Sequence, residues 1–262
     1  MKVTIKSAEE IELMREAGKI LASVHQNLAK EIRPGMSTAD IDRLGEDMIL
    51  SYGCIPSFKN YLGYPASVCV SVNEEVVHGI PTAHRIIKEG DIVSLDAGVI
   101  YKGYHSDAAR TIPVGAVSTQ AGLLIERTKE SFFRGMKMAR AGKHLHDISR
   151  AIGDYAESFG YGVVRDLCGH GIGSSLHEEP EIPNYRKLSR GIKLQPGMTL
   201  AVEPMINTGT RDVFWAEDGW TVITADESLS AHYENTILIT EGKPEILSLT
   251  EEEKQAGLLE AI

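Results

Sequence analysis

The chain has 262 residues, of which 42% are hydrophobic and 24% charged, a composition typical of a globular protein with one large domain or two modest ones. Its net charge of -10 argues against a protein that binds nucleic-acid backbones, because such proteins concentrate Lys and Arg. The lack of a signal peptide, of a membrane-spanning window and of CxxC spacing among the three cysteines predicts a soluble, cytoplasmic protein without disulfides.

The first half of the sequence predicts two helices followed by strands. A capping box at Ser7–Glu10 opens the first helix, and Pro34 with Gly35 ends it. The other predicted elements of this half, each bounded by turn residues, are a helix from Ser37 to about Tyr52 and strands at 68–72, 91–95 and 111–114. Pro113 marks the last of these as the end or edge of a strand.

The second half repeats this order of helices and strands. It predicts helices at about 118–139 and 145–159, and strands near 161–168, 199–202, 221–224 and 236–240. No Ser- or Gly-rich linker separates the halves. We therefore expect one α+β domain over 1–262, with internal halves of about 1–115 and 116–262 that share one continuous sheet and one core.

Segments that start with glycine recur 107 residues apart, which indicates an internal duplication. The matching pairs are Gly35/Gly142, Asp40/Asp147, Gly90/Gly197 and Asp96/Glu203. A later pair, Asp107 and Glu234, is 127 residues apart, so about 20 extra residues fall between Glu203 and Glu234 in the second copy. The alternative is chance similarity between amphipathic segments, which two blocks at one offset disfavour.

Four acids, Asp96, Asp107, Glu203 and Glu234, are candidates for chemistry. Asp96 ends an apolar strand, and a strand–turn–strand spacing brings Asp107 to face it; Glu203 and Glu234 follow the same pattern with a longer loop. An acid in apolar surroundings is costly unless it is paired or binds a metal. Each acid alone fits a helix cap or an ion pair, but the four together predict a two-metal centre.

Three histidines accompany these acids. His170 lies within Gly169–Gly173, where glycines let the backbone approach a ligand or take positive φ, so that the imidazole is presented rather than packed. His78 and His177 are each followed three residues later by Pro. Carboxylates with one imidazole suit Mn, Fe, Co or Zn better than Mg. An isolated histidine is usually a surface or core residue, and we expect that of His25, His84, His105, His144 and His146.

With these residues in place, the chain resembles the type I, bacterial-type methionine aminopeptidases over essentially its whole length. The resemblance rests on the order Asp96, Asp107, His170, Glu203 and Glu234, with His-Gly-Ile-Pro at 78–81 and Gly-His-Gly-Ile-Gly at 169–173. It implies the pita-bread fold, a curved antiparallel sheet flanked by two pairs of helices with pseudo-two-fold symmetry. It also implies two divalent ions (Co, Mn, Fe or Zn), one bound by Asp96 and the other by His170 and Glu203, with Asp107 and Glu234 bridging both.

The resemblance further implies a mechanism. A metal-bridging water or hydroxide is the nucleophile, and Glu203 is the proton shuttle. His177 stabilises the peptide carbonyl oxygen or the tetrahedral intermediate, and His78 contacts the scissile amide.

The same resemblance implies a substrate pocket and a cation site. The walls of the pocket for the methionine side chain correspond to Phe58, Tyr61, Tyr64, Cys69, Leu176 and Trp220. Cys69 also fits plain core packing, and Leu176 stands where some relatives have an aromatic residue. Asn73 and Ser230, with the backbone near Glu75, match a site for a monovalent cation (Na or K).

The substrates implied are the N-termini of nascent polypeptides with a small second residue, because the site is walled in just past the scissile bond. The resemblance also implies a monomer and allows transient association with the ribosome, although the sequence has no basic extension that would mediate it. We expect no specific nucleic acid and no membrane partner.

Three alternatives share the fold. A prolidase or proline-specific aminopeptidase has the same five ligands but usually carries an additional N-terminal domain, for which a first helix beginning near residue 8 leaves no room. A type II methionine aminopeptidase needs a helical insertion in the second half. A non-catalytic pita-bread protein typically loses ligands, and all five are present here.

Overall fold

The computed structural model describes residues 3–257 and contains both predicted pairs of helices. The helices are α1 (Ala8–Glu31), α2 (Thr38–Ser51), α3 (Thr119–Met136), α4 (Leu145–Glu157) and a short α5 (Glu251–Gln255). Capping boxes begin α1 and α2, where Ser7 pairs with Glu10 and Ser37 with Asp40. Among the described residues, no helix is long and apolar enough to cross a membrane.

The strands form two antiparallel sheets. The large sheet contains β1 (Ile55–Pro56), β2 (Val68–Val72), β4 (Ile92–Tyr101), β5 (Tyr104–Pro113), β6 (Gly162–Val163), β7 (Gly169–Gly171), β8 (Glu178–Ile182), β9 (Thr199–Val202), β10 (Met205–Asn207), β13 (Ser230–Leu238) and β14 (Glu245–Ile246). Its main order is β1-β4-β5-β13-β9-β7-β8. The small sheet has the order β11-β12-β3, from β11 (Val213–Trp215), β12 (Val222–Thr224) and β3 (Glu75–Val77).

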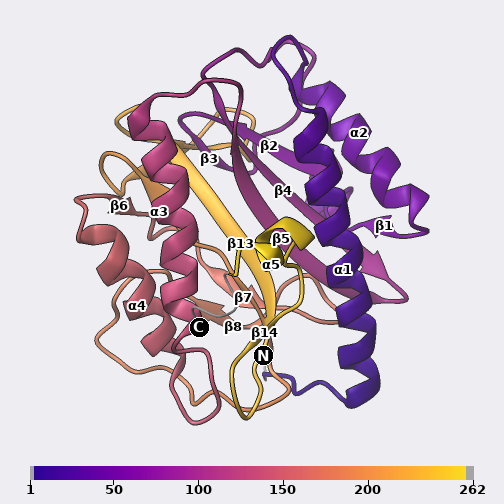
Figure 1. Ribbon diagram of the computed structural model, residues 1–262, viewed down its shortest axis with the longest axis vertical. Helices are drawn as coiled ribbons and strands as arrows, with labels where there is room; N and C mark the ends of the chain where they lie inside the picture. The colour runs from indigo at the N-terminus through magenta and orange to yellow at the C-terminus, as the bar shows by residue number, and fades with distance from the viewer. Residues whose placement is uncertain (1–2, 258–262) are drawn as a thin grey trace.

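The two pairs of helices cover one face of the large sheet, as Figure 1 shows. Helices α1 and α2 pack against β2, β4 and β5, whereas α3 and α4 pack over the strands of the second half. The buried hydrophobic side chains accordingly form a separate large cluster beneath each pair. The expected α+β class is confirmed, and the two halves share the large sheet as expected, with a small sheet in addition. The expectation of one core is wrong, because each amphipathic pair of helices buries its own apolar stripe.

The internal repeat is visible in the backbone. Gly35 and Gly142 have φ of 93° and 83°, and Gly90 and Gly197 have φ of 91° and 85°, values that L side chains rarely adopt. Asp147 is the N3 residue of α4, as Asp40 is of α2. The copies meet at β5 and β13, which are neighbours in the sheet. The sequence repeat is therefore also a structural repeat.

Several predicted boundaries were wrong. Strand β4 continues to Tyr101 and β5 begins at Tyr104, whereas the sequence predicts strands only at 91–95 and 111–114. The segment 161–168 is not one strand, because its exposed polar residues 165–166 separate β6 from β7. The strand predicted at 236–240 is the end of β13, which begins at Ser230; its first half was missed because it buries polar side chains. Helix α3 ends at Met136 rather than near 139. The extra residues of the second copy contain the β11–β12 hairpin, in the interval where the repeat predicts them.

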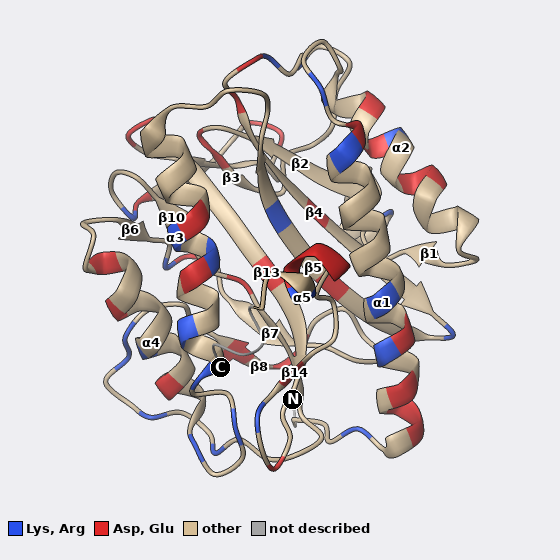
Figure 2. Ribbon diagram, in the orientation of Figure 1, with Lys and Arg blue, Asp and Glu red and all other residues tan. Residues whose placement is uncertain are grey.

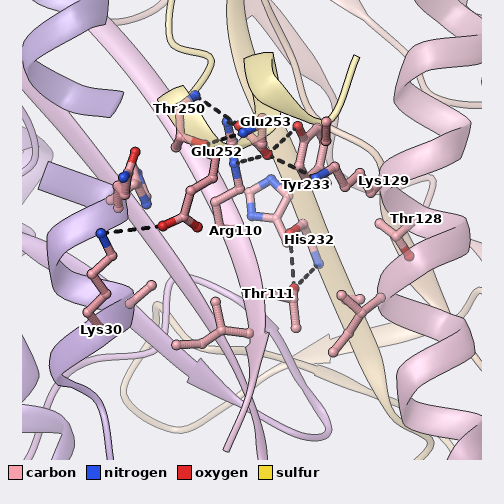
Figure 3. Close-up of a pocket in the computed structure, with 17 residues that line it drawn as sticks. Lys30, Arg110, Thr111, Thr128, Lys129, His232, Tyr233, Thr250, Glu252 and Glu253 are labelled. Carbon is pink, nitrogen blue, oxygen red and sulfur yellow. Dashed lines mark hydrogen bonds and ion pairs between the residues drawn. The ribbon is translucent and has the colours of Figure 1, made fainter. Parts of the chain in front are cut away.

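An ion pair on the helix side of the large sheet joins α5 to the central strands (Figure 3). Arg110 of β5 donates two 2.9 Å hydrogen bonds to the Glu253 carboxylate and one of 2.8 Å to Asn235 Oδ1. Tyr233 donates to Glu253 at 2.7 Å, and its ring lies under the guanidinium. The Arg110 guanidinium also donates to the carbonyl oxygen of Glu234. The network therefore ties the last helix to the strand that carries Glu234.

The cavity drawn in Figure 3 lies beside this network, between α1, α3 and α5. Its volume is about 410 Å³. Lys30 at its edge pairs with Glu252, and Lys129 pairs with Glu253. Each of these lysines therefore already has a carboxylate partner, and Glu253 is shared between Lys129 and Arg110.

We expect Glu253→Gln to lower the free energy of unfolding by about 3 kcal/mol at neutral pH, because it leaves a buried arginine without its counter-charge. Burial opposes ionisation of Glu253, but Arg110 outweighs burial and holds the pKa of this carboxyl well below its usual range. The stabilisation is therefore complete above the unfolded-state pKa of about 4.3 and is lost as the pH falls toward the folded-state value. Urea unfolding at several pH values measures this; a constant difference between variant and wild type from pH 7 to 3 would contradict the linkage.

Candidate active site

A second pocket, of about 220 Å³, lies on the other face of the large sheet. Side chains alternate along a strand, so Asp107 and Glu234 point away from the side to which Arg110 and Tyr233 point. Thirteen side chains predicted from the sequence line this one pocket: Phe58, Tyr61, Tyr64, Cys69, His78, Asp96, Asp107, His170, Leu176, His177, Glu203, Trp220 and Glu234.

Adjacent strands position the carboxylates. Asp96 of β4 and Glu234 of β13 are both in register with Ala109 of β5, while Asp107 pairs with Gly98. Asp96 and Asp107 are thus diagonal neighbours on one face rather than directly opposite, and Asp96 lies within β4 rather than at its end. The prediction failed in these details because β4 continues beyond its apolar run to Tyr101.

Glu203 occupies a break between two strand segments. Strands β9 and β10 both pair with β13, and Glu203 with Pro204 interrupts them. Val202 pairs with Asn235, which brings Glu203 beside Glu234. Asn184 Nδ2 donates to the Glu203 carbonyl oxygen at 3.0 Å and fixes this break. The expected proximity of the two glutamates is therefore reached through β13, although the intervening chain forms further strands instead of a simple hairpin.

Within residues 3–257, none of the four carboxylates forms an ion pair with Lys or Arg. Burial raises the pKa of Asp96 to about 7. Burial, followed by repulsion from neighbouring carboxylates, raises the pKa values of Asp107, Glu203 and Glu234 well above their usual range. Oδ1 of Asp96, Oδ1 of Asp107 and Oε1 of Glu234 are buried without a hydrogen-bond partner. Such a cluster is costly by itself, and a bound divalent cation would remove the cost.

Two groups of donor atoms fit such a cation. Asp107, His170 and Glu234 each place a ligand atom within 4.8 Å of the others, and so do Asp96, His232 and Glu234. Glu234 belongs to both groups. Carboxylate oxygens with imidazole nitrogen are suitable ligands for Mn, Fe, Co or Zn, so the residues present fit the implied metal.

His170 is oriented for ligation. Its Nδ1 lies 2.8 Å from the carbonyl oxygen of Gly171, to which it donates, so Nε2 keeps its lone pair. Nε2 is 3.7 Å from Glu203 Oε1 and 3.9 Å from Asp107 Oδ2. Burial lowers the pKa of His170 to about 3, which keeps the ring neutral.

The glycines around His170 allow neighbouring strands to pack closely against β7. A Cβ at Gly169 would lie 2.4 Å from the Ala201 carbonyl oxygen, and one at Gly171 would lie 2.1 Å from the Glu179 carbonyl oxygen. Neither glycine has positive φ. They let β8 and β9 approach β7 closely, and that approach brings His170 to the carboxylates.

His78 and His177 line the pocket beside this cluster. His177 Nδ1 is 2.8 Å from the Tyr61 hydroxyl, and its ring centroid is 4.2 Å from that of His170. Burial lowers the pKa of both flanking histidines, to about 4 for His78. His78 follows β3 with φ of 60°, a strained conformation that is common at functional sites.

The apolar wall is formed around two aromatic rings. Tyr64 and Trp220 meet edge to face with centroids 5.2 Å apart, and the Tyr64 hydroxyl donates to the Gly79 carbonyl oxygen. Trp220 comes from the chain between β11 and β12. Cys69 is in register with Asp96 and lines the pocket, so of its two expected positions the structure places it in the wall. Leu176 is buried in the same hydrophobic cluster as Tyr64 and Cys69.

Two residues that line or border the site were not predicted. Leu62 lines the pocket mouth, with 80% of its surface exposed and φ of 50°. His232 is buried beside Glu203 and Glu234. Period-two alternation within a strand would have placed His232 on the same face as Glu234, but only once β13 was recognised to begin at Ser230.

Two further expectations from the sequence concern His105 and the proposed cation site at Asn73 and Ser230. His105 is not among the residues that line the pocket; its Nδ1 lies 3.0 Å from Ser57 Oγ, consistent with the expected core role. Asn73 and Ser230 are adjacent, since the Ser230 amide donates to the Asn73 carbonyl oxygen at 2.9 Å. A monovalent cation at that position stays a prediction.

We expect Mn²⁺ or Co²⁺ to raise the midpoint of thermal unfolding, because a metal that binds only the folded chain stabilises it by about 2.7 kcal/mol at 100 times its dissociation constant. A chelator should reverse the shift. Glu203→Ala and His170→Ala should fold but lose most of the shift and all turnover. A wild-type protein whose midpoint ignores both metal and chelator would argue against a metal centre here.

Comparisons with known proteins agree with this geometry. The model of metallopeptidase family M24 matches residues 12–241. A methionine aminopeptidase from Clostridium acetobutylicum is 55% identical over 249 residues, which are 95% of this chain and 100% of the relative. The crystal structure of a methionine aminopeptidase from Thermotoga maritima superposes with a TM-score of 0.92 at 45% identity, covering 95% of this chain and 100% of that one.

A more distant solved structure has the same fold. The Xaa-Pro dipeptidase from Bacillus anthracis gives a TM-score of 0.74 at 27% identity, covering 93% of this chain and 61% of that chain. These likenesses bear out the predicted pita-bread fold. The chain belongs to metallopeptidase family M24.

Proposed function

We propose that this chain is a methionine aminopeptidase, which removes the N-terminal methionine from proteins whose second residue is small. The observation that carries the proposal is the single pocket in which a carboxylate and histidine cluster adjoins a small apolar wall. The likeness to methionine aminopeptidases at 45–55% identity supports the same activity, whereas the likeness to the Xaa-Pro dipeptidase is weaker.

The site would hold two divalent ions. Asp96 would bind one ion, His170 and Glu203 the other, and Asp107 with Glu234 would contact both. When bound, these ions would supply Lewis-acid polarisation of the scissile carbonyl and an activated water at neutral pH. Mn, Fe, Co and Zn all suit these ligands, and the supply in the cell would decide among them.

Glu203 is placed to carry a proton. Its carboxylate is largely buried at the break between β9 and β10, next to Glu234. Burial, followed by repulsion from Asp96, raises its pKa, which favours uptake of a proton by this carboxylate. We propose that Glu203 moves the proton from the attacking water to the leaving amine.

His177 is placed to act as a hydrogen-bond donor. When the Tyr61 hydroxyl donates to Nδ1 across 2.8 Å, the ring carries its proton on Nε2. Partial desolvation in the pocket lowers the pKa of this imidazole, which favours its neutral form. We propose that Nε2–H of His177 donates to the carbonyl oxygen as negative charge develops on it, while His78 contacts the scissile amide.

Side-chain specificity would come from the apolar wall. Phe58, Tyr64, Cys69 and Leu176 are buried, and Trp220 closes the wall against Tyr64. A thioether packs favourably against aromatic edges. An unbranched apolar side chain such as that of methionine therefore suits this pocket of about 220 Å³.

The cellular setting follows from this activity. We propose a cytoplasmic monomer that acts on newly made polypeptides, with transient ribosome contact and no specific nucleic-acid or membrane partner. Figure 2 shows acidic and basic residues interspersed along the ribbons of α1 and α3, so any ribosome contact would need a surface other than a basic stripe on these helices. A Na or K ion near Asn73 and Ser230 is part of the same proposal.

We expect the metal-loaded protein to release methionine from Met-Ala-Ser and to leave Ala-Pro peptides intact. Chromatography of the released amino acid measures both reactions. Cleavage of the proline peptide alone would favour the prolidase alternative, and cleavage of neither peptide with any of the four metals would favour a non-catalytic binding protein.

We expect His177→Ala to lower kcat by about 100-fold or more with little change in KM, since removal of one donor to a developing oxyanion costs about 2.7–4 kcal/mol. Steady-state kinetics on Met-Ala-Ser separates the two constants. A rise in KM alone would reassign His177 to substrate binding.

A further inference from the structure

His232 is a buried histidine that the proposed mechanism does not use. It lies on β13, with 1% of its surface exposed, and neither ring nitrogen has a hydrogen-bond partner among the described residues. A buried polar group without a partner costs about 1–3 kcal/mol. A buried histidine that carries this cost of desolvation therefore needs an explanation, and a functional role is one.

The surroundings of His232 mirror those of His170. His232 Nε2 is 3.7 Å from Glu203 Oε2 and 3.8 Å from Glu234 Oε2. His170 Nε2 is 3.7 Å from the other oxygen of Glu203, Oε1. The Glu203 carboxylate therefore lies between two imidazoles, with one facing each of its oxygens.

The two imidazoles differ in their second nitrogen. Nδ1 of His170 donates to the Gly171 carbonyl oxygen, which leaves a lone pair on Nε2 for a metal. Nδ1 of His232 has no such acceptor, so nothing holds its proton on Nδ1. The carboxylate oxygens of Glu203 and Glu234 that face Nε2 favour a proton on that nitrogen.

We propose that His232 is a positioning residue whose Nε2–H donates to Oε2 of Glu203 and thereby keeps Oε1 turned toward His170 and the metal. The present 3.7 Å separation exceeds a hydrogen bond, and a small rotation of the carboxylate would close it. The backbone of His232 is held for this purpose, since its amide donates to Thr111 Oγ1 at 2.8 Å and its carbonyl accepts from the same hydroxyl at 3.0 Å.

This inference rests on the proposed metal centre, and the test separates the two. Wild-type chain is titrated calorimetrically with Co²⁺, its visible Co²⁺ spectrum is recorded, and kcat and KM are measured on Met-Ala-Ser. Failure of the wild type to bind metal and to release methionine overturns the proposed function itself. The comparison of variants then applies only to an active wild type.

The decisive pair is His232→Gln and His232→Met. Glutamine can place an N–H near the position of Nε2, whereas methionine fills similar space without a donor. We expect the Met variant to lose about 10- to 100-fold in Co²⁺ affinity and kcat, with an altered Co²⁺ spectrum, as is typical when a partner of a metal ligand is removed. The Gln variant should stay within about threefold of wild type.

Two results would overturn the inference. Wild-type affinity, spectrum and kcat in the Met variant would show that His232 does not position Glu203. Equal loss in the Gln and Met variants would show that the ring itself is required, as for a direct metal ligand, because an amide cannot replace an imidazole there.

Two further variants serve as a control for the loss of a buried histidine and as a substitute if His232→Met does not fold. His25→Met removes another buried histidine, from α1 on the helix side of the sheet; it should lower the unfolding midpoint of the metal-free protein without altering the Co²⁺ spectrum. If the His232→Met chain does not fold, His232→Asn replaces it. Asparagine keeps the amide but is one methylene shorter than glutamine, so it should lose affinity where glutamine retains it.

Discussion

The repulsion among four buried carboxylates, with no Lys or Arg lining their pocket, is the constraint on which the rest of this structure depends. Each raised pKa in the cluster records free energy that folding must supply from elsewhere. The backbone that carries the acids is fixed by neutral groups: Thr236 Oγ1 accepts from the Asp107 amide and donates to its carbonyl oxygen, and Asn184 holds the carbonyl of Glu203. These contacts thereby hold the backbone where the carboxylates can bind a divalent cation.

The two faces of the large sheet have different roles, one in stability and the other in the proposed chemistry. The helix face holds the apolar clusters and the paired Arg110 and Glu253. The other face holds the unpaired acids. Because neighbouring residues of one strand point to opposite faces, Tyr233 can support the C-terminal helix while Glu234 serves the pocket. The hydrogen bond from Arg110 to the Glu234 carbonyl oxygen connects this stabilising ion pair to β13, the strand that carries a proposed metal ligand.

The internal duplication explains both the symmetry of the site and its exceptions. Each copy supplies an acid from a strand that follows a glycine turn, and the matched φ angles of Gly90 and Gly197 show how alike these turns are. The second copy differs by supplying His170 from β7 and by inserting the β11–β12 hairpin, whose connection carries Trp220. A symmetric scaffold thus holds an asymmetric pocket, with the apolar wall on one side of the carboxylates.

By itself, the sequence determined the helix pairs and the repeat, because capping boxes, glycine turns and apolar periodicity are local signals. It also indicated thirteen of the fourteen residues that line the pocket, because the spaced acids and histidines resemble a known family. Tertiary structure alone decided the diagonal placement of Asp96 and Asp107, the break at Glu203, the separate small sheet and the place of His232. These depend on register between strands distant in the sequence, which local propensity does not encode. Buried polar residues also hid the first half of β13, because a strand that faces a metal site lacks the apolar alternation by which strands are recognised.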